Sequence, residues 1–71
     1  MTAYSLEEVK QIINEIGPDK VKVVFRYLHT ELRETRYAVF MEGEYVNVYR
    51  SPFCEGITKI YDINIHGGWL E

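Results

Sequence analysis

The sequence predicts an α+β fold in which one N-terminal helix packs on a three- or four-stranded antiparallel sheet. Three observations indicate this fold. Apolar residues recur at helical spacing near the N-terminus, runs rich in β-branched and aromatic residues follow, and Gly and Pro separate the segments. The chain has 71 residues, of which 46% are hydrophobic and 27% charged. This length and composition predict a single small domain over residues 1–71.

The first predicted element is a helix over residues 5–16. Ser5 and Glu8 fit a capping box, in which the Ser5 hydroxyl accepts from the backbone three residues on and Glu8 reaches back. Gly17 suits the left-handed turn that ends a helix, and Pro18 prevents its continuation. The apolar face of this helix consists of Leu6, Val9, Ile12, Ile13 and Ile16.

The next segment, residues 20–34, fits either a strand or a second helix. The density of β-branched and aromatic residues over 21–27 favours a strand, followed by a loop over 29–34. If this segment were a helix, the predicted sheet would contain only three strands. As a strand, the segment has one face that carries Val21, Val23, Phe25 and Tyr27, and an opposite face that carries Lys20, Lys22 and Arg26.

A β-hairpin is predicted around Gly43, which separates alternating runs at 37–41 and 45–49. Ser51-Pro52 ends the second run, a loop follows over 53–56, and a last strand is expected over 57–63. One face of the hairpin carries Tyr37, Val39, Met41, Val46 and Val48. The other face carries Ala38, Phe40, Tyr45, Asn47 and Tyr49.

This second face is the candidate binding surface, because a single helix covers only one face of a sheet. Tyrosine supplies a large contact area at low entropic cost, and aromatic residues are enriched at interfaces. Trp69, beyond the Gly67-Gly68 pair, is a further candidate anchor. Lys22, Arg26 and Ile60 would adjoin the face in some strand orders. The residues predicted to bind a partner are Phe40, Tyr45, Asn47, Tyr49 and Trp69.

A purely structural interpretation stands beside this one. The aromatic rings of the sheet would then pair across strands and stabilise the fold, and Trp69 would pack back on its own sheet. The last two residues, Leu70-Glu71, also match a dipeptide typical of a cloning remnant, in which case the natural chain ends at Trp69.

The sequence predicts no catalytic residue, no cofactor-binding residue and no metal site. The soft metal ligands are Cys54, His29 and His66, and their scattered positions do not suggest a tetrahedral site. An enzyme or small-molecule binder would have to use Cys54 and His66. Eight basic residues against eleven acidic ones make nucleic acid an unlikely partner, because such binding depends on neutralising phosphates.

The function predicted from these features is that of a non-enzymatic interaction protein, an inhibitor or adaptor. It would bind another macromolecule through the aromatic sheet face or an edge strand. The alternatives are a homodimeric structural domain, which the small size favours, and a single-strand nucleic-acid binder. A lone cysteine and the lack of a long apolar run predict a cytoplasmic protein without a membrane segment.

Overall fold

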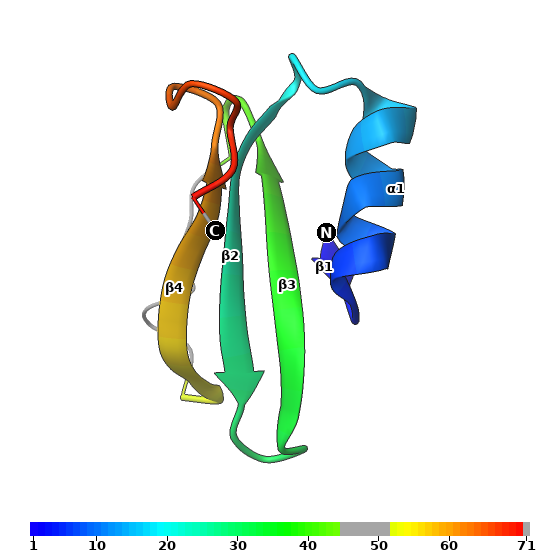
Figure 1. The fold of residues 1–71 in the computed structure, drawn as a ribbon. Helices are drawn as coiled ribbons and strands as arrows, with labels where there is room; N and C mark the ends of the chain where they lie inside the picture. Colours follow the sequence, from blue (N-terminus) through cyan, green and yellow to red (C-terminus); the bar gives the residue numbers. More distant parts are fainter. Residues whose placement is uncertain (45–51, 71) are drawn as a thin grey trace.

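The computed structural model describes residues 1–44 and 52–70, and Figure 1 shows a helix beside an antiparallel sheet. The predicted α+β fold is confirmed, with a sheet of four strands. In chain order the elements are β1 (Thr2–Ala3), α1 (Leu6–Ile16), β2 (Val21–His29), β3 (Glu34–Met41) and β4 (Cys54–Asp62). The strand order is β1-β3-β2-β4, so β2 and β3 are central.

Helix α1 begins and ends where its sequence predicts. The Ser5 hydroxyl accepts from the Glu8 backbone N–H at 3.2 Å, and Gly17, with φ +114°, donates its N–H to the Ile13 carbonyl at 2.9 Å. The capping box differs in one bond, because the Glu8 carboxylate accepts from the Ser5 hydroxyl itself at 3.3 Å. The helix buries Val9 and Ile13 against the sheet.

Ser5→Ala is expected to lower the free energy of unfolding by about 1 kcal/mol, because the Glu8 N–H loses its acceptor at the start of α1. Ser5→Asp keeps an acceptor oxygen at the same position and is the matched control. Urea unfolding followed by circular dichroism measures both variants. An unchanged midpoint for Ser5→Ala would contradict the capping role.

Residues 20–34 form a strand and a turn, as favoured by their β-branched content. Strand β2 reverses into β3 through residues 30–33, and β3 begins at Glu34, earlier than predicted. His29 holds this turn, since its carbonyl accepts from Arg33 N–H at 2.7 Å and its Nδ1 accepts from Leu32 N–H at 3.2 Å. The tight turn therefore links β2 to β3.

The predicted hairpin around Gly43 is described only in part. The turn is present, because Glu44 N–H donates to the Met41 carbonyl at 3.2 Å and Gly43 has φ +89°. Its second run, residues 45–49, lies outside the described residues. Over residues 37 and 38, β3 pairs with β2 on one side and with β1 on the other. Strand β1 was not predicted, and its Ala3 is fully buried.

A β-bulge corrects the faces predicted for β2. The pairing of β2 with β3 shifts register between Val21 and Val23, which inserts one residue and breaks the alternation. Val21 and Val24 therefore both belong to the core beneath α1, whereas Phe25 is buried outside that core. The prediction of one continuous face from Val21 to Tyr27 is wrong for this reason.

The pairing of β4 with β2 shifts register twice, between Val24 and Phe25 and between Arg26 and Leu28. β4 begins at Cys54, so most of the loop predicted over 53–56 is part of the strand. The pairing with β2 shifts between Val24 and Phe25, and both Ile60 and Tyr61 are buried in the core. The shift gives β4 two consecutive inward residues. The expectation that Ile60 adjoins the second sheet face is consequently wrong.

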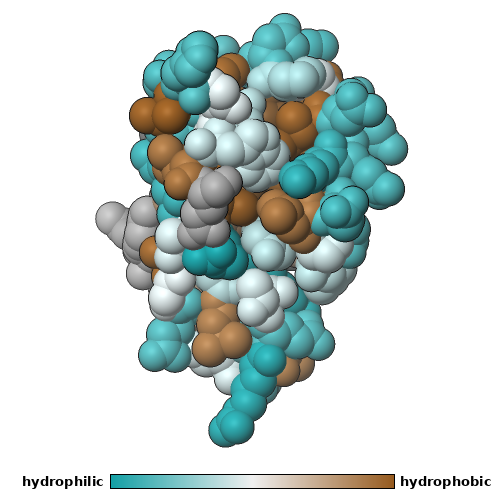
Figure 2. Space-filling view, viewed as in Figure 1, coloured by the Kyte–Doolittle hydropathy of each residue, from teal (hydrophilic) through white to brown (hydrophobic). Residues whose placement is uncertain are grey.

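The core lies between α1 and one face of the sheet, here called the helix face. Its central strand pair is Val24 with Val39, and Tyr61 pairs with Val24 from the other side. Figure 2 shows the apolar surface that remains visible, broken up by polar side chains. The buried cluster consists of Ala3, Val9, Ile13, Val21, Val24, Val39, Ile60 and Tyr61.

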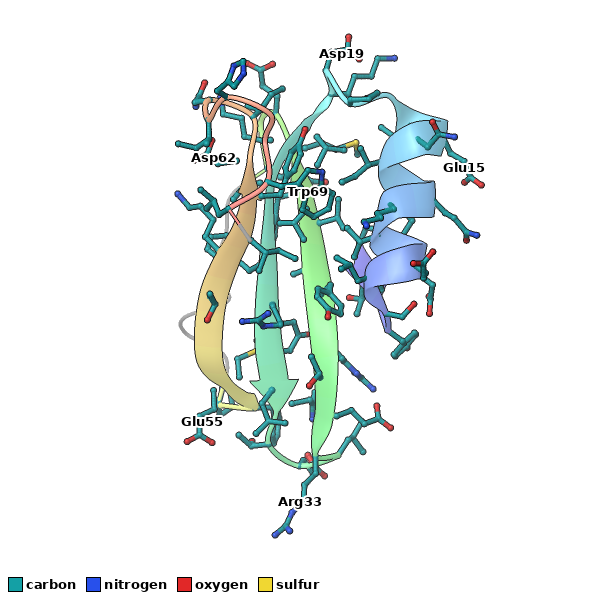
Figure 3. All side chains as sticks on the ribbon, viewed as in Figure 1. Glu15, Asp19, Arg33, Glu55, Asp62 and Trp69 are labelled. Atoms are coloured by element: carbon teal, nitrogen blue, oxygen red, sulfur yellow. The ribbon has the colours of Figure 1, made fainter. Side chains whose placement is uncertain are left out.

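The C-terminal segment folds back along β4, and residues 68–70 are here called the C-terminal clasp. Gly68 accepts from Asp62 N–H at 2.8 Å, and Leu70 donates to the Ile60 carbonyl at 2.9 Å. The backbones of Trp69 and Tyr61 form an isolated antiparallel β-bridge, and the two rings meet edge to face with centroids 5.0 Å apart. Figure 3 shows Trp69 beside the sheet on the side of α1. The clasp thus completes the core between β4 and the helix.

Candidate functional site

The sheet face turned away from α1, here called the far face, carries the main aromatic cluster of the described chain. Ala38 and Phe40 share this face, as the alternation of β3 predicts, and they pair with Phe25 and Val23 of β2. Phe25 is 5% exposed, and its ring meets Phe40 edge to face at 6.2 Å. The far face therefore has a buried aromatic centre.

Beside this centre lies a second group of side chains, here called the Tyr4–Arg36 platform, which consists of Tyr4, Tyr27, Glu34 and Arg36. The guanidinium carbon of Arg36 lies 5.0 Å from the Tyr4 ring centroid, and Nη2 of Arg36 is 3.1 Å from Oε2 of Glu34. Arg36 also pairs with Tyr27 across the sheet. Residues of β2 and β3, together with Tyr4 just after β1, therefore converge on the Arg36 guanidinium.

Exposure differs sharply within the platform. Tyr4 is 59% exposed, while the Arg36 side chain that lies over it is 18% exposed. The Nε atom of Arg36 is buried and has no hydrogen-bond partner among the described residues. The guanidinium is thus held by its contacts with Tyr4, Tyr27 and Glu34, and its Nε donor is unused among the described residues.

Tyr27 is the uncharged neighbour of Arg36 in the platform. Burial raises the pKa of Tyr27, and the nearby Cys54 adds to this rise, while the charge and a hydrogen bond of Arg36 oppose it. A tyrosine phenol is protonated at neutral pH even at its ordinary pKa, so the positive charge of Arg36 is balanced by Glu34 and not by Tyr27. The platform therefore offers an aromatic ring, a cation and an exposed carboxylate.

The described members of the predicted binding set lie on different faces. Phe40 is half-buried on the far face next to Phe25. Trp69 is half-buried on the helix face, where it contacts Tyr61 and lies beneath the Lys10 ammonium at 5.9 Å. This position matches the structural interpretation, in which Trp69 packs on its own sheet. The other three members, Tyr45, Asn47 and Tyr49, lie outside the described residues.

The cations expected beside the aromatic face lie elsewhere. Arg26 pairs with Tyr37 and Thr58, which places it on the helix face. Lys22 is exposed at the β2 bulge. The expectation of a basic row beside Phe40 is therefore wrong for Arg26, because the bulge changes which residues of β2 share a face. Sequence reasoning missed Tyr4 and Arg36, because no signal in the sequence indicates that residues 2–3 pair with β3.

The polar residues considered for chemistry are spread along the molecule. Cys54 begins β4 and His66 follows its end, so the strand separates them by roughly 25 Å. His29 stacks on Phe53, with ring centroids 5.6 Å apart. Within residues 1–44 and 52–70 there is no pocket and no group of His, Cys, Asp and Glu placed to hold a metal ion.

One carboxylate at the upper end of β4 is well anchored. Asp62, labelled in Figure 3, accepts from Asn64 N–H at 2.9 Å and from Lys59 at 3.2 Å, and these two hydrogen bonds lower the pKa of Asp62. The first bond lies in the turn that leads to the C-terminal clasp, and the second joins two residues of β4. Asp62 therefore has a structural explanation and is no candidate for acid–base chemistry.

Comparisons with protein-family models, with curated proteins and with solved structures find no match to this chain. Among the described helices, none has the length and apolar character needed to cross a membrane.

Proposed function

We propose that this chain is a non-enzymatic interaction protein, an inhibitor or adaptor, and that it binds a protein partner through the Tyr4–Arg36 platform. One observation carries the proposal: an exposed Tyr4 ring is held against a guanidinium that Glu34 anchors in turn. Tyrosine and arginine are over-represented among the residues that dominate binding energy at protein interfaces. Their fixed geometry reduces the entropy lost on binding.

The chemistry of the platform indicates what a partner would present. An apolar side chain would pack on the exposed part of the Tyr4 ring. A partner carboxylate that displaces the exposed Glu34 would take over its charge-assisted bond to Arg36, which is stronger than a neutral hydrogen bond. Phe40 lies about 13 Å further along β3 on the same face, well within the span of an ordinary interface.

The test is capture of a partner on immobilised protein, followed by a measured dissociation constant for the protein that is retained. Tyr4→Ala is expected to weaken this binding by about tenfold or more, the range expected for an interface anchor. Leu32→Ala is the matched control, because Leu32 is a similarly exposed apolar residue in the β2–β3 turn. Thermal unfolding of both variants verifies that the fold is retained.

Equal affinities for Tyr4→Ala and the wild type would show that the platform is not the binding site.

A separate titration tests the nucleic-acid alternative with short single-stranded oligonucleotides at low salt. Binding that falls steeply as salt increases would favour the nucleic-acid alternative over a protein partner.

A further inference from the structure

A second surface lies on the helix face, at the end of the sheet that α1 does not reach. An 11-residue helix is about 16 Å long, whereas the nine residues of β2 span about 30 Å. Figure 1 shows α1 beside the end of the sheet where β2 begins, with no described segment in front of the opposite end. This second area, here called the open half, consists of Arg26, Leu28, Thr35, Glu55 and Thr58.

The open half has an apolar centre between two opposite charges. Leu28 is 40% exposed although it lies in a central strand of the sheet. Arg26 precedes it by two residues on the same face of β2, and Glu55 of β4 pairs directly with Leu28. Figure 3 shows Glu55 at the outer end of β4, near the tip marked by Arg33. Thr35 and Thr58 fill the remaining positions without charge.

This arrangement is self-complementary. Arg26 lies about 7 Å from Leu28 along the strand, and Glu55 about 5 Å from Leu28 across the sheet. A two-fold axis parallel to the sheet and passing close to Leu28 can therefore place Arg26 of one chain over Glu55 of another. The same operation brings the two Leu28 side chains together and repeats the ion pair, as every symmetric dimer interface requires.

We propose that the open half docks a second copy of this chain, with Leu28 against Leu28 and Arg26 against Glu55 in both directions. The proposal does not depend on the Tyr4–Arg36 platform, which lies on the opposite face. Arg26 already interacts within its own chain. In the proposed dimer its charge stays at the same position and faces Glu55 of the second copy. Burial of Leu28 would also supply apolar area that so small a domain lacks.

A charge-swap experiment tests this interface. Sedimentation equilibrium of the wild type over micromolar concentrations is expected to show mass rising from 8.4 kDa towards twice that value. Arg26→Glu and Glu55→Arg each place like charges opposite one another, so each alone is expected to weaken the dimer by about tenfold or more. An equimolar mixture of the two variants restores both opposed pairs and is expected to recover the dimer mass.

Matched controls separate this interface from general charge effects. Glu15→Arg makes the same change as Glu55→Arg on the outside of α1, and Lys20→Glu reverses a cation just before β2; neither should alter the mass. Leu28→Lys should yield a monomer, and it tests the interface even if the half-buried Arg26 variant fails to fold. A wild type that stays at 8.4 kDa, or variants that dimerise as the wild type does, would overturn the proposal.

Discussion

Gly68→Ala is expected to lower the free energy of unfolding by about 2–5 kcal/mol, a large fraction of the total for a domain of this size. Gly68 is buried and has φ +80°, a conformation that costs a residue with a Cβ atom free energy by itself. A Cβ at this position would also lie 2.9 Å from Cζ of Tyr61. The substitution therefore combines backbone strain with a steric clash.

Tyr61 has little room to yield. The residue is 6% exposed within the core, its ring meets Trp69, and its hydroxyl donates to the Pro18 carbonyl at 3.3 Å. A displaced Tyr61 would lose contacts at both ends of its side chain. The C-terminal clasp would then separate from β4, with loss of the backbone bonds that Gly68 and Leu70 make there.

Gly67→Ala is the matched control, because Gly67 also has φ +80° but no described heavy atom lies within 4 Å of the position that an added Cβ would take. Only backbone strain applies there, at about 1–2 kcal/mol. Urea unfolding of both variants, followed by circular dichroism, gives the difference that belongs to the clash with Tyr61. Equal destabilisation by the two substitutions would mean that the clasp does not pack on Tyr61 in solution.

Trp69→Ala is expected to lower the free energy of unfolding by about 2–3 kcal/mol, below the range for a fully buried tryptophan because Trp69 is half-buried. The variant removes the edge-to-face contact with Tyr61 and the ring beneath Lys10. Trp69→Phe retains an aromatic ring and should recover part of the loss. Leu70→Ala, at a neighbouring exposed position, is the control and should change stability little.

This measurement also decides between two roles for Trp69. Loss of stability in Trp69→Ala identifies the ring as part of the core, as its contacts indicate. Unchanged stability would leave the ring available to a partner, as the binding set of Phe40, Tyr45, Asn47, Tyr49 and Trp69 predicts. Because Trp69 is the single tryptophan, its own fluorescence in the wild type reports release of the clasp during unfolding.

The candidate site was predictable only in outline. The alternation of β3 placed Ala38 and Phe40 together on a second face, and this grouping is confirmed by their pairing with β2. Tyr4 and Arg36 were not predicted as neighbours, because 32 positions of sequence separate them and a two-residue strand brings them together. Nothing in the local pattern around Tyr4 indicates a strand.

The sequence by itself determined α1 and the approximate position of the central strands. Helix boundaries depend on local signals, and Ser5 and Gly17 satisfy backbone groups within a few residues of themselves. The content of β-branched and aromatic residues likewise favoured a strand over a second helix for β2. These features need no information from distant parts of the chain.

Only the tertiary structure decided which side chains share a face. A shift of one residue in strand pairing moves every following side chain to the opposite face, and such a shift is set by the partner strand. The bulge after Val21 therefore placed Arg26 and Leu28 on the open half, and the shift near Phe25 buried Ile60. Long-range packing on Tyr61 likewise decided the position of Trp69, because no local bond holds that ring.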